Sequence, residues 1–158
     1  MTGMHPNCVA VDAVLAAAGV GGRVKLLPHA APTAVAAAEQ LGVEVGAIAN
    51  SLIFATAEDE AVLVLTSGAH RVDPVKVAAL LGTTRVRRAD ADLVRAATGQ
   101  PIGGIAPVAH PAPLRTLVDL ALRAHPQVWA AGGIPHAVFP TSFDELVELT
   151  DGLPARVA

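Results

Sequence analysis

Two pairs of adjacent glycines mark places where the main chain itself could contact a polar ligand. The first pair, Gly103 and Gly104, lies in a segment with prolines at 101 and 107. Glycine lets a ligand approach the backbone closely, and flanking prolines stiffen a loop. Such a loop can present N–H and C=O groups without using any side chain. The composition alone equally suits a tight turn, and no Lys-Ser/Thr follows the glycines, which excludes a nucleotide-phosphate loop.

The second pair, Gly132 and Gly133, follows an expected strand and precedes His136. Glycines at a strand end often mark a close approach of another group. His136 could hydrogen-bond a substrate or narrow a pocket, although a lone histidine in such a position is more commonly an ordinary turn residue.

Metal-dependent and covalent mechanisms find little support in the sequence. No histidine lies in an HExxH or Cys/His spacing, so we expect no metal site. Cys8 would need a neighbouring base to act as a nucleophile, and a structural cysteine is the simpler interpretation. There is also no GxSxG motif. The histidines outside the second glycine segment are scattered, at His5, His29, His70, His110 and His125.

The chain has one cluster of basic residues, around Arg85, Arg87 and Arg88, with Arg71 and Lys76 upstream. On a strand, alternate residues share a face, so Arg85 and Arg87 would point the same way. This cluster could contact RNA phosphates, but a charged strand at the edge of a sheet is the more common explanation.

The composition predicts one folded domain over residues 1–158. Hydrophobic residues make up 53% and charged residues 16% of the chain, which excludes a disordered protein. The mean hydropathy is +0.51, yet no apolar run is long enough to span a bilayer. A single cysteine and the absence of a secretory signal predict a soluble, cytoplasmic protein. The net charge of −3 excludes a general polyanion binder.

The elements that must position these residues follow from apolar periodicity and from Gly, Pro and capping residues. Helices are expected over residues 6–18, 32–41, 73–81, 90–98 and 142–151. Strands are expected over residues 24–27, 48–56, 61–67, 85–88, 127–131 and 137–139, with a hairpin joining 48–56 to 61–67. Residues 114–119 suit either a strand or a helix, and residues 99–113 are irregular. The irregular order favours a mixed sheet with helices over a doubly wound fold.

Read together, these segments resemble the YbaK/prolyl-tRNA-editing domain family from about residue 5 to about residue 152. The matching segments are residues 26–29, 39–42, 48–54, 68–73 with Lys76, 103–107, 131–133 and 143–146. Each motif is weak alone, and their order and spacing make the combination specific. The resemblance implies an α+β fold with a curved, mixed and partly barrel-like β-sheet ringed by helices.

The resemblance also implies a function. Members of the family hydrolyse the ester that joins a wrong small amino acid to tRNA, here as a free-standing, trans-editing enzyme acting on tRNA(Pro)-type substrates without a cofactor. The implied partners are the tRNA acceptor end and prolyl-tRNA synthetase. The implied catalytic residues are Gly103, Gly104, Ile105, Ala106, Pro107 and Asn50. The implied substrate-binding residues are His29, Ser51, Gly132, Gly133 and His136.

One position departs from the family pattern. Asn50 stands where the family commonly has a lysine, so a hydrogen-bond donor is kept and a positive charge is lost. Two alternatives therefore stay open. The chain could be a non-catalytic module that binds an aminoacyl-tRNA end or a synthetase, or an unrelated esterase that acts on simple esters.

Overall fold

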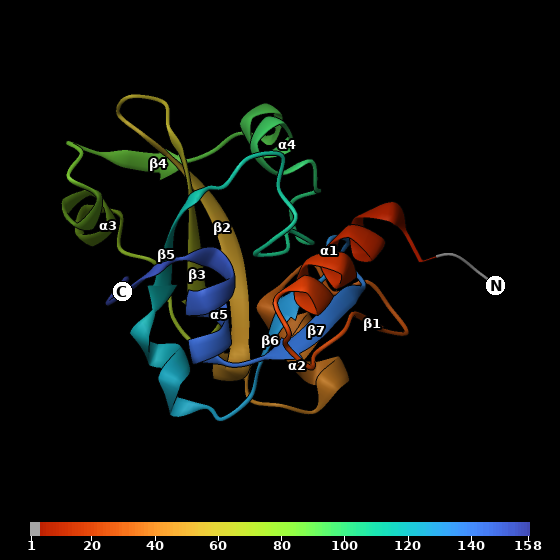
Figure 1. The fold of residues 1–158 in the computed structure, drawn as a ribbon. Coiled ribbons are helices and arrows are strands. Elements are labelled where there is room, and N and C mark those ends of the chain that lie inside the picture. The colour runs from red at the N-terminus through yellow and green to blue at the C-terminus, as the bar shows by residue number, and fades with distance from the viewer. Residues whose placement is uncertain (1–3) are drawn as a thin grey trace.

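The computed structural model describes residues 4–158, so residues 1–3 of the predicted domain lie outside the described part. The fold is α+β, with a mixed sheet and helices against it (Figure 1). The helices are α1 (Pro6–Ala17), α2 (Ala34–Leu41), α3 (Pro74–Leu81), α4 (Ala91–Thr98) and α5 (Phe143–Thr150), with 3-10 turns η1 (Val45–Ala47) and η2 (Leu120–Ala124). The strands are β1 (Lys25–Leu26), β2 (Ile48–Thr56), β3 (Ala61–Ser67), β4 (Val86–Arg88), β5 (Arg115–Asp119), β6 (Val128–Ala131), β7 (Ala137–Thr141) and β8 (Leu153–Ala155).

The sheet has the strand order β1-β7-β6-β2-β3-β5-β8, and β4 pairs with β2 beside this path. The β2–β3 hairpin is antiparallel, whereas β6 joins β2, β5 joins β3 and β8 joins β5 in parallel. The expected mixed sheet is therefore confirmed. No helix in residues 4–158 is long and apolar enough to cross a membrane.

Helices cover both faces of the sheet. On one face, β2 and β3 side chains pack against Leu15 of α1, Val94 of α4 and Leu146 of α5. On the other face, Phe54 and neighbouring β3 side chains pack against α3. Helix α2 closes a smaller cluster around Ile48. Most of these contacts involve Val, Leu and Ala, as the scarcity of aromatic residues requires.

Local sequence signals account for the helix boundaries. Helices α2 to α5 each begin with a side chain that accepts a hydrogen bond from a first-turn N–H, and such caps stabilise a helix by about 1 kcal/mol. The capping residues are Thr33, Asp73, Asp90 and Ser142. Ser142 and Glu145 have the spacing of a capping box, in which each accepts a hydrogen bond from the backbone N–H of the other. Only the bond from Glu145 N–H to Ser142 Oγ forms, and the Glu145 carboxylate accepts from Thr141 Oγ1.

The structure adds elements that the sequence pattern left open. Residues 114–119, ambiguous in the sequence, form strand β5 from Arg115. Strand β8 and the turns η1 and η2 were not expected. Each of these is five residues or shorter, and elements of this length carry too little periodicity to be recognised.

Candidate active site

The candidate site lies along one edge of β2, in the gap between the two strands that pair with that edge, β6 and β4. Strand β6 pairs with β2 only at Ile48 and Ala49, and β4 pairs with it only from Phe54 onward. Residues 50–52 therefore have no strand partner on that edge, although β3 pairs continuously along the other. Figure 1 shows β4 near the upper end of β2 and β6 near its lower end. The division leaves Asn50 and Ser51 beside open space.

A cavity of about 40 Å³ occupies this division. Its wall comes from the start of α2 and the segment before it, from β2, from β6 and β7, and from the loop after α4. The lining residues are Ala31, Pro32, Thr33, Ala34, Ala37, Ile48, Ala49, Asn50, Ser51, Gly103, Ile105, Trp129, Ala130, Ala131, Pro135, Ala137 and Val138. Many of them are alanines, so the wall of the cavity is largely apolar.

The cavity opens into a groove of about 230 Å³. The two hollows share Asn50, Ser51, Gly103 and Ile105, so they form one cleft. Arg88 of β4 and Ile102 stand along the groove. Among the described residues that line either hollow, Arg88 is the only charged one. The cleft thus combines a small, largely apolar cavity with a larger groove that carries one positive charge.

Gln100 holds the loop that follows α4. Its side chain is 5% exposed, and its Oε1 accepts a 2.6 Å hydrogen bond from the Ala106 N–H. Its Nε2 donates to the carbonyls of Val108 and Ala109, each at 3.3 Å. One buried amide therefore joins two ends of the loop, and the loop backbone is fixed without regular secondary structure.

The glycines of this loop bring it against the second glycine segment. A Cβ at Gly104 would stand 2.6 Å from Ile134 Cα, so only glycine permits this contact. Gly103 has a φ of +92° and lies against Pro32. Ile105 and Ala106 are buried behind them. The two predicted segments, around 103–107 and 132–136, therefore meet at the cleft.

The loop presents two free donors beside the cavity. The N–H groups of Gly103 and Ile105 form no hydrogen bond with another described residue, whereas Gly104 N–H donates to the Pro101 carbonyl at 3.0 Å. Both residues line the cavity. Unpaired N–H groups next to a cavity can stabilise negative charge on an oxygen bound there.

His110 holds the loop through a hydrogen bond to the loop backbone. Its Nε2 lies 2.8 Å from the Ala106 carbonyl, which only accepts, so Nε2 carries the proton and donates. Burial lowers the pKa of His110, and this hydrogen bond partly offsets the effect. His110 is therefore neutral near pH 7 and acts on the loop through a hydrogen bond.

The predicted site residues divide into two groups. Asn50, Ser51, Gly103 and Ile105 line the cleft, and Gly104 packs directly behind it. Ala106 and Pro107 are buried in the loop without lining either hollow.

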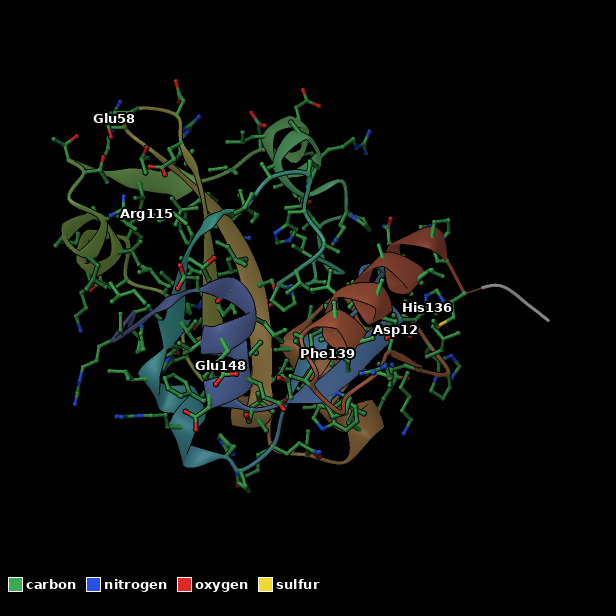
Figure 2. All side chains as sticks on the ribbon, viewed as in Figure 1. Asp12, Glu58, Arg115, His136, Phe139 and Glu148 are labelled. Atoms are coloured by element: carbon green, nitrogen blue, oxygen red, sulfur yellow. The ribbon has the colours of Figure 1, made fainter. Side chains whose placement is uncertain are left out.

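Four predicted substrate-binding residues do not line the cleft. Gly132 and Gly133 are buried facing other elements, and the Asn7 amide of α1 donates to the Gly133 carbonyl at 2.9 Å. His136 is exposed beside the start of α1 (Figure 2). His29 is exposed as well. Their contact with a substrate stays a prediction.

The backbone of the second glycine segment nevertheless supports the site. The His136 carbonyl accepts from Leu27 N–H and the Pro135 carbonyl accepts from Ala31 N–H, both at 2.7 Å. These bonds hold the segment that carries Ala31 and Pro32 into the cavity wall.

Sequence reasoning missed the structural role of Gln100 and gave Arg88 no separate role within its basic cluster. A buried amide cannot be recognised from its type, but its position between Gly99 and Pro101 in an otherwise apolar loop is a usable signal. Arg88 differs from Arg87 in the contacts of its guanidinium group, which lies over the Phe54 ring. Arg87 contacts Asp59 at 3.3 Å and does not line the groove, which Arg88 lines.

The described residues offer no alternative centre for metal or thiol chemistry. No group of three or more His, Cys, Asp or Glu side chains in residues 4–158 is arranged to hold a metal ion. Cys8 is fully buried in α1. Burial raises the pKa of the Cys8 thiol, and the nearby Asp12 carboxylate raises it further. A neutral, buried thiol is a poor nucleophile.

Comparison with known proteins identifies the family of this chain. The sequence profile of the aminoacyl-tRNA editing domain family matches residues 28–149. A search of curated proteins found no match.

Three solved structures are similar over nearly the whole chain. A candidate trans-editing enzyme for prolyl-tRNA synthetase is 39% identical, with a TM-score of 0.91 and 98% of each chain covered. A chain solved in work on grafting linear epitopes onto scaffold proteins is 39% identical, with a TM-score of 0.89, covering 98% of this chain and 97% of that one. The hypothetical protein APE2540 is 32% identical, with a TM-score of 0.87, covering 94% and 98%. The chain belongs to the aminoacyl-tRNA editing domain family.

Proposed function

We propose that the protein is a free-standing deacylase that hydrolyses the ester between tRNA and a wrongly attached small amino acid. The observation that carries the proposal is the alanine-walled cavity of about 40 Å³ beside two unpaired loop N–H groups. A cavity of about 150 Å³ holds a benzene ring, so by proportion 40 Å³ holds about one or two heavy atoms. This matches the side chain of alanine, serine or cysteine and excludes larger ones.

Orientation and electrostatics account for the proposed chemistry. The amino-acid side chain enters the cavity, and the ester carbonyl oxygen lies toward the N–H groups of Gly103 and Ile105. Water adds to the carbonyl carbon, the bond to the ribose oxygen breaks, and that oxygen takes up a proton. Donors fixed where negative charge develops commonly accelerate such a step by about 10²–10³-fold each. The neighbouring ribose hydroxyl helps to place the water.

The groove would hold the terminal nucleotide of the tRNA. Its volume of about 230 Å³ suits part of a nucleoside, and Ile102, 54% exposed, offers an apolar surface to a base. Arg88 supplies the positive charge for a phosphate oxygen. Asn50 donates a neutral hydrogen bond to the substrate. A tRNA(Pro)-type substrate and a relation to prolyl-tRNA synthetase are supported by the similarity to the trans-editing candidate.

A panel of charged tRNAs tests the proposal. Purified protein should release Ala, Ser or Cys from mischarged tRNA(Pro) faster than buffer does, and should leave prolyl-tRNA(Pro) intact. Release is followed with radiolabelled amino acid. No release above buffer from any of these tRNAs, with a known deacylase active in parallel, contradicts the proposal.

Asn50 favours one alternative, a module that binds an aminoacyl-tRNA end without hydrolysing it, because the family's usual charge is missing from the cavity wall. The variant Asn50→Lys separates the two functions. Hydrolysis that appears only in the variant supports the binding module, whereas hydrolysis by the unmodified protein excludes it.

A further inference from the structure

We propose that the Ser51 hydroxyl recognises the side chain of the bound amino acid, so that the cavity favours a seryl ester over an alanyl ester. The inference rests on the proposed function and names the substrate class that this cavity selects.

The observation is an unpaired hydroxyl. Ser51 Oγ has less than 1 Å² exposed and no hydrogen-bond partner, and it is the one buried side-chain polar atom in residues 4–158 of which this is true. Buried hydroxyl groups in proteins are nearly always paired, so an exception needs an explanation. Ser51 lies on the stretch of β2 that has no strand partner, and it lines both the cavity and the groove.

The rest of the cavity wall does not supply the missing partner. The other hydroxyl on that wall belongs to Thr33, whose Oγ1 already accepts the Ala36 N–H at 3.2 Å as the cap of α2. The remaining side chains there are apolar, apart from Asn50 and the indole of Trp129. With less than 1 Å² exposed, Ser51 Oγ meets an occupant of the cavity after its side chain turns to another χ1 rotamer. The hydrogen bond gained there makes such an occupant the natural partner for Ser51.

The size of the cavity selects the occupant. Space for about one or two heavy atoms admits the methyl group of alanine or the hydroxymethyl group of serine. The serine hydroxyl pairs with Ser51 Oγ, whereas the alanine methyl group leaves it unpaired. A site that hydrogen-bonds a substrate hydroxyl discriminates against the analogue that lacks it. For one neutral pair, we expect a preference of about tenfold to a hundredfold.

Ser51 could instead bond the α-amino group or the ester, which seryl and alanyl substrates share. Loss of Ser51 would then slow both substrates by the same factor. The ratio of the two rates, and not either rate alone, therefore reports on side-chain recognition.

The experiment compares single-turnover hydrolysis of seryl- and alanyl-tRNA(Pro) by the unmodified protein, by Ser51→Ala and by the control Ser67→Ala. Ser67 lies on β3, donates from Oγ to the Gly46 carbonyl at 2.9 Å and lines neither hollow. We expect the seryl-to-alanyl ratio to be about 10 to 100 in the unmodified protein and in Ser67→Ala. We expect it to fall to about 1 in Ser51→Ala, through a slower seryl reaction alone. An equal loss with both substrates, an unchanged ratio, or an initial preference for alanine overturns the inference.

A binding measurement separates failure of this inference from failure of the proposed function. Adenosines that carry serine or alanine through a 3′-amide cannot be hydrolysed, and calorimetry gives their affinities for the same three proteins. If no ester is hydrolysed but the seryl amide binds about tenfold or more tightly, and Ser51→Ala removes the difference, Ser51 recognises serine in a protein that is not a deacylase. Equal affinities in the unmodified protein contradict the inference whatever the activity.

Discussion

At the scale of single residues, the cleft has an unusual distribution of charge. Asn50 places a neutral amide on the wall of the cavity, and that wall has no charged residue. The positive charge of the cleft lies instead on Arg88 of β4, which pairs with Phe54 of β2 and has its guanidinium 5.7 Å from the centre of that ring. The charge thus lines the groove and not the cavity, and in the groove it suits the binding of a phosphate better than the chemistry at an ester.

This distribution predicts that Arg88→Ala weakens substrate binding without slowing the chemical step. A hydrogen bond between charged groups contributes about 1.5–3 kcal/mol, so KM should rise about tenfold to a hundredfold while kcat changes little. Arg85→Ala is the matched control, because Arg85 is exposed on the same segment and lines neither hollow. Steady-state deacylation kinetics measure both constants. A fall in kcat with KM unchanged would place the charge in the chemical step instead.

Gly103 tests whether the loop N–H groups act in catalysis. The variant Gly103→Ala forces a side chain onto a φ of +92° and places its Cβ 3.3 Å from Pro32, which displaces the N–H beside the cavity. We expect kcat to fall by about 10²–10³-fold. Gly99→Ala carries a comparable strain, at φ +69° with open space around it, and lies outside the cavity. Thermal melts should show similar, small losses of stability in both variants, and only Gly103→Ala should lose activity.

At the scale of elements, the loop after α4 depends on buried polar groups. Gln100 joins Ala106 to the end of the loop, Thr98 Oγ1 accepts the Gln100 N–H at 3.0 Å, and His110 donates to the Ala106 carbonyl. These hydrogen bonds between side chains and backbone hold the loop, as backbone hydrogen bonds hold a strand or a helix. The loop is irregular in shape but fixed in position, as its proposed role in holding donors at an ester requires.

The low pKa of His110 makes loop stability depend on pH. Because burial lowers the pKa in the folded protein, the unfolded chain binds more protons just below the ordinary pKa of about 6.5. The free energy of unfolding should therefore fall as the pH is lowered from 7 to 5, and less so in His110→Gln. Urea denaturation across this range measures the slope. An identical slope in His110→Gln and in the unmodified protein would contradict the assignment.

The sequence predicted most elements but only part of the site. The hairpin 48–56/61–67 and the helix ends at Gly42, Gly82 and Gly99 are confirmed, because local periodicity and capping determine them. The division of the sheet could not be predicted. It depends on a parallel contact between β2 and β6 of only two residue pairs, which joins segments about 80 residues apart and leaves no local pattern. The same non-local geometry keeps His29 and His136 out of the cleft.

At the scale of the whole molecule, the net charge of −3 limits how the protein meets tRNA. Salt lowers the affinity for nucleic acid by a slope that grows with the number of phosphates contacted. If Arg88 supplies the main phosphate contact, the plot of log affinity against log salt should have a slope of about −1, and Arg88→Ala should reduce it toward zero. A fluorescence titration with an acceptor-stem minihelix measures both slopes. A slope of −4 or steeper in the unmodified protein would require a much larger RNA-binding surface.

The missing strand partner of residues 50–52 has a consequence beyond catalysis. An uncovered strand edge can pair with another chain and start aggregation. Ile105 packs in the same cluster as Ala49 and Ile53, so the loop that carries the donors also covers this edge. Substitutions that loosen the loop should therefore promote self-association at high protein concentration.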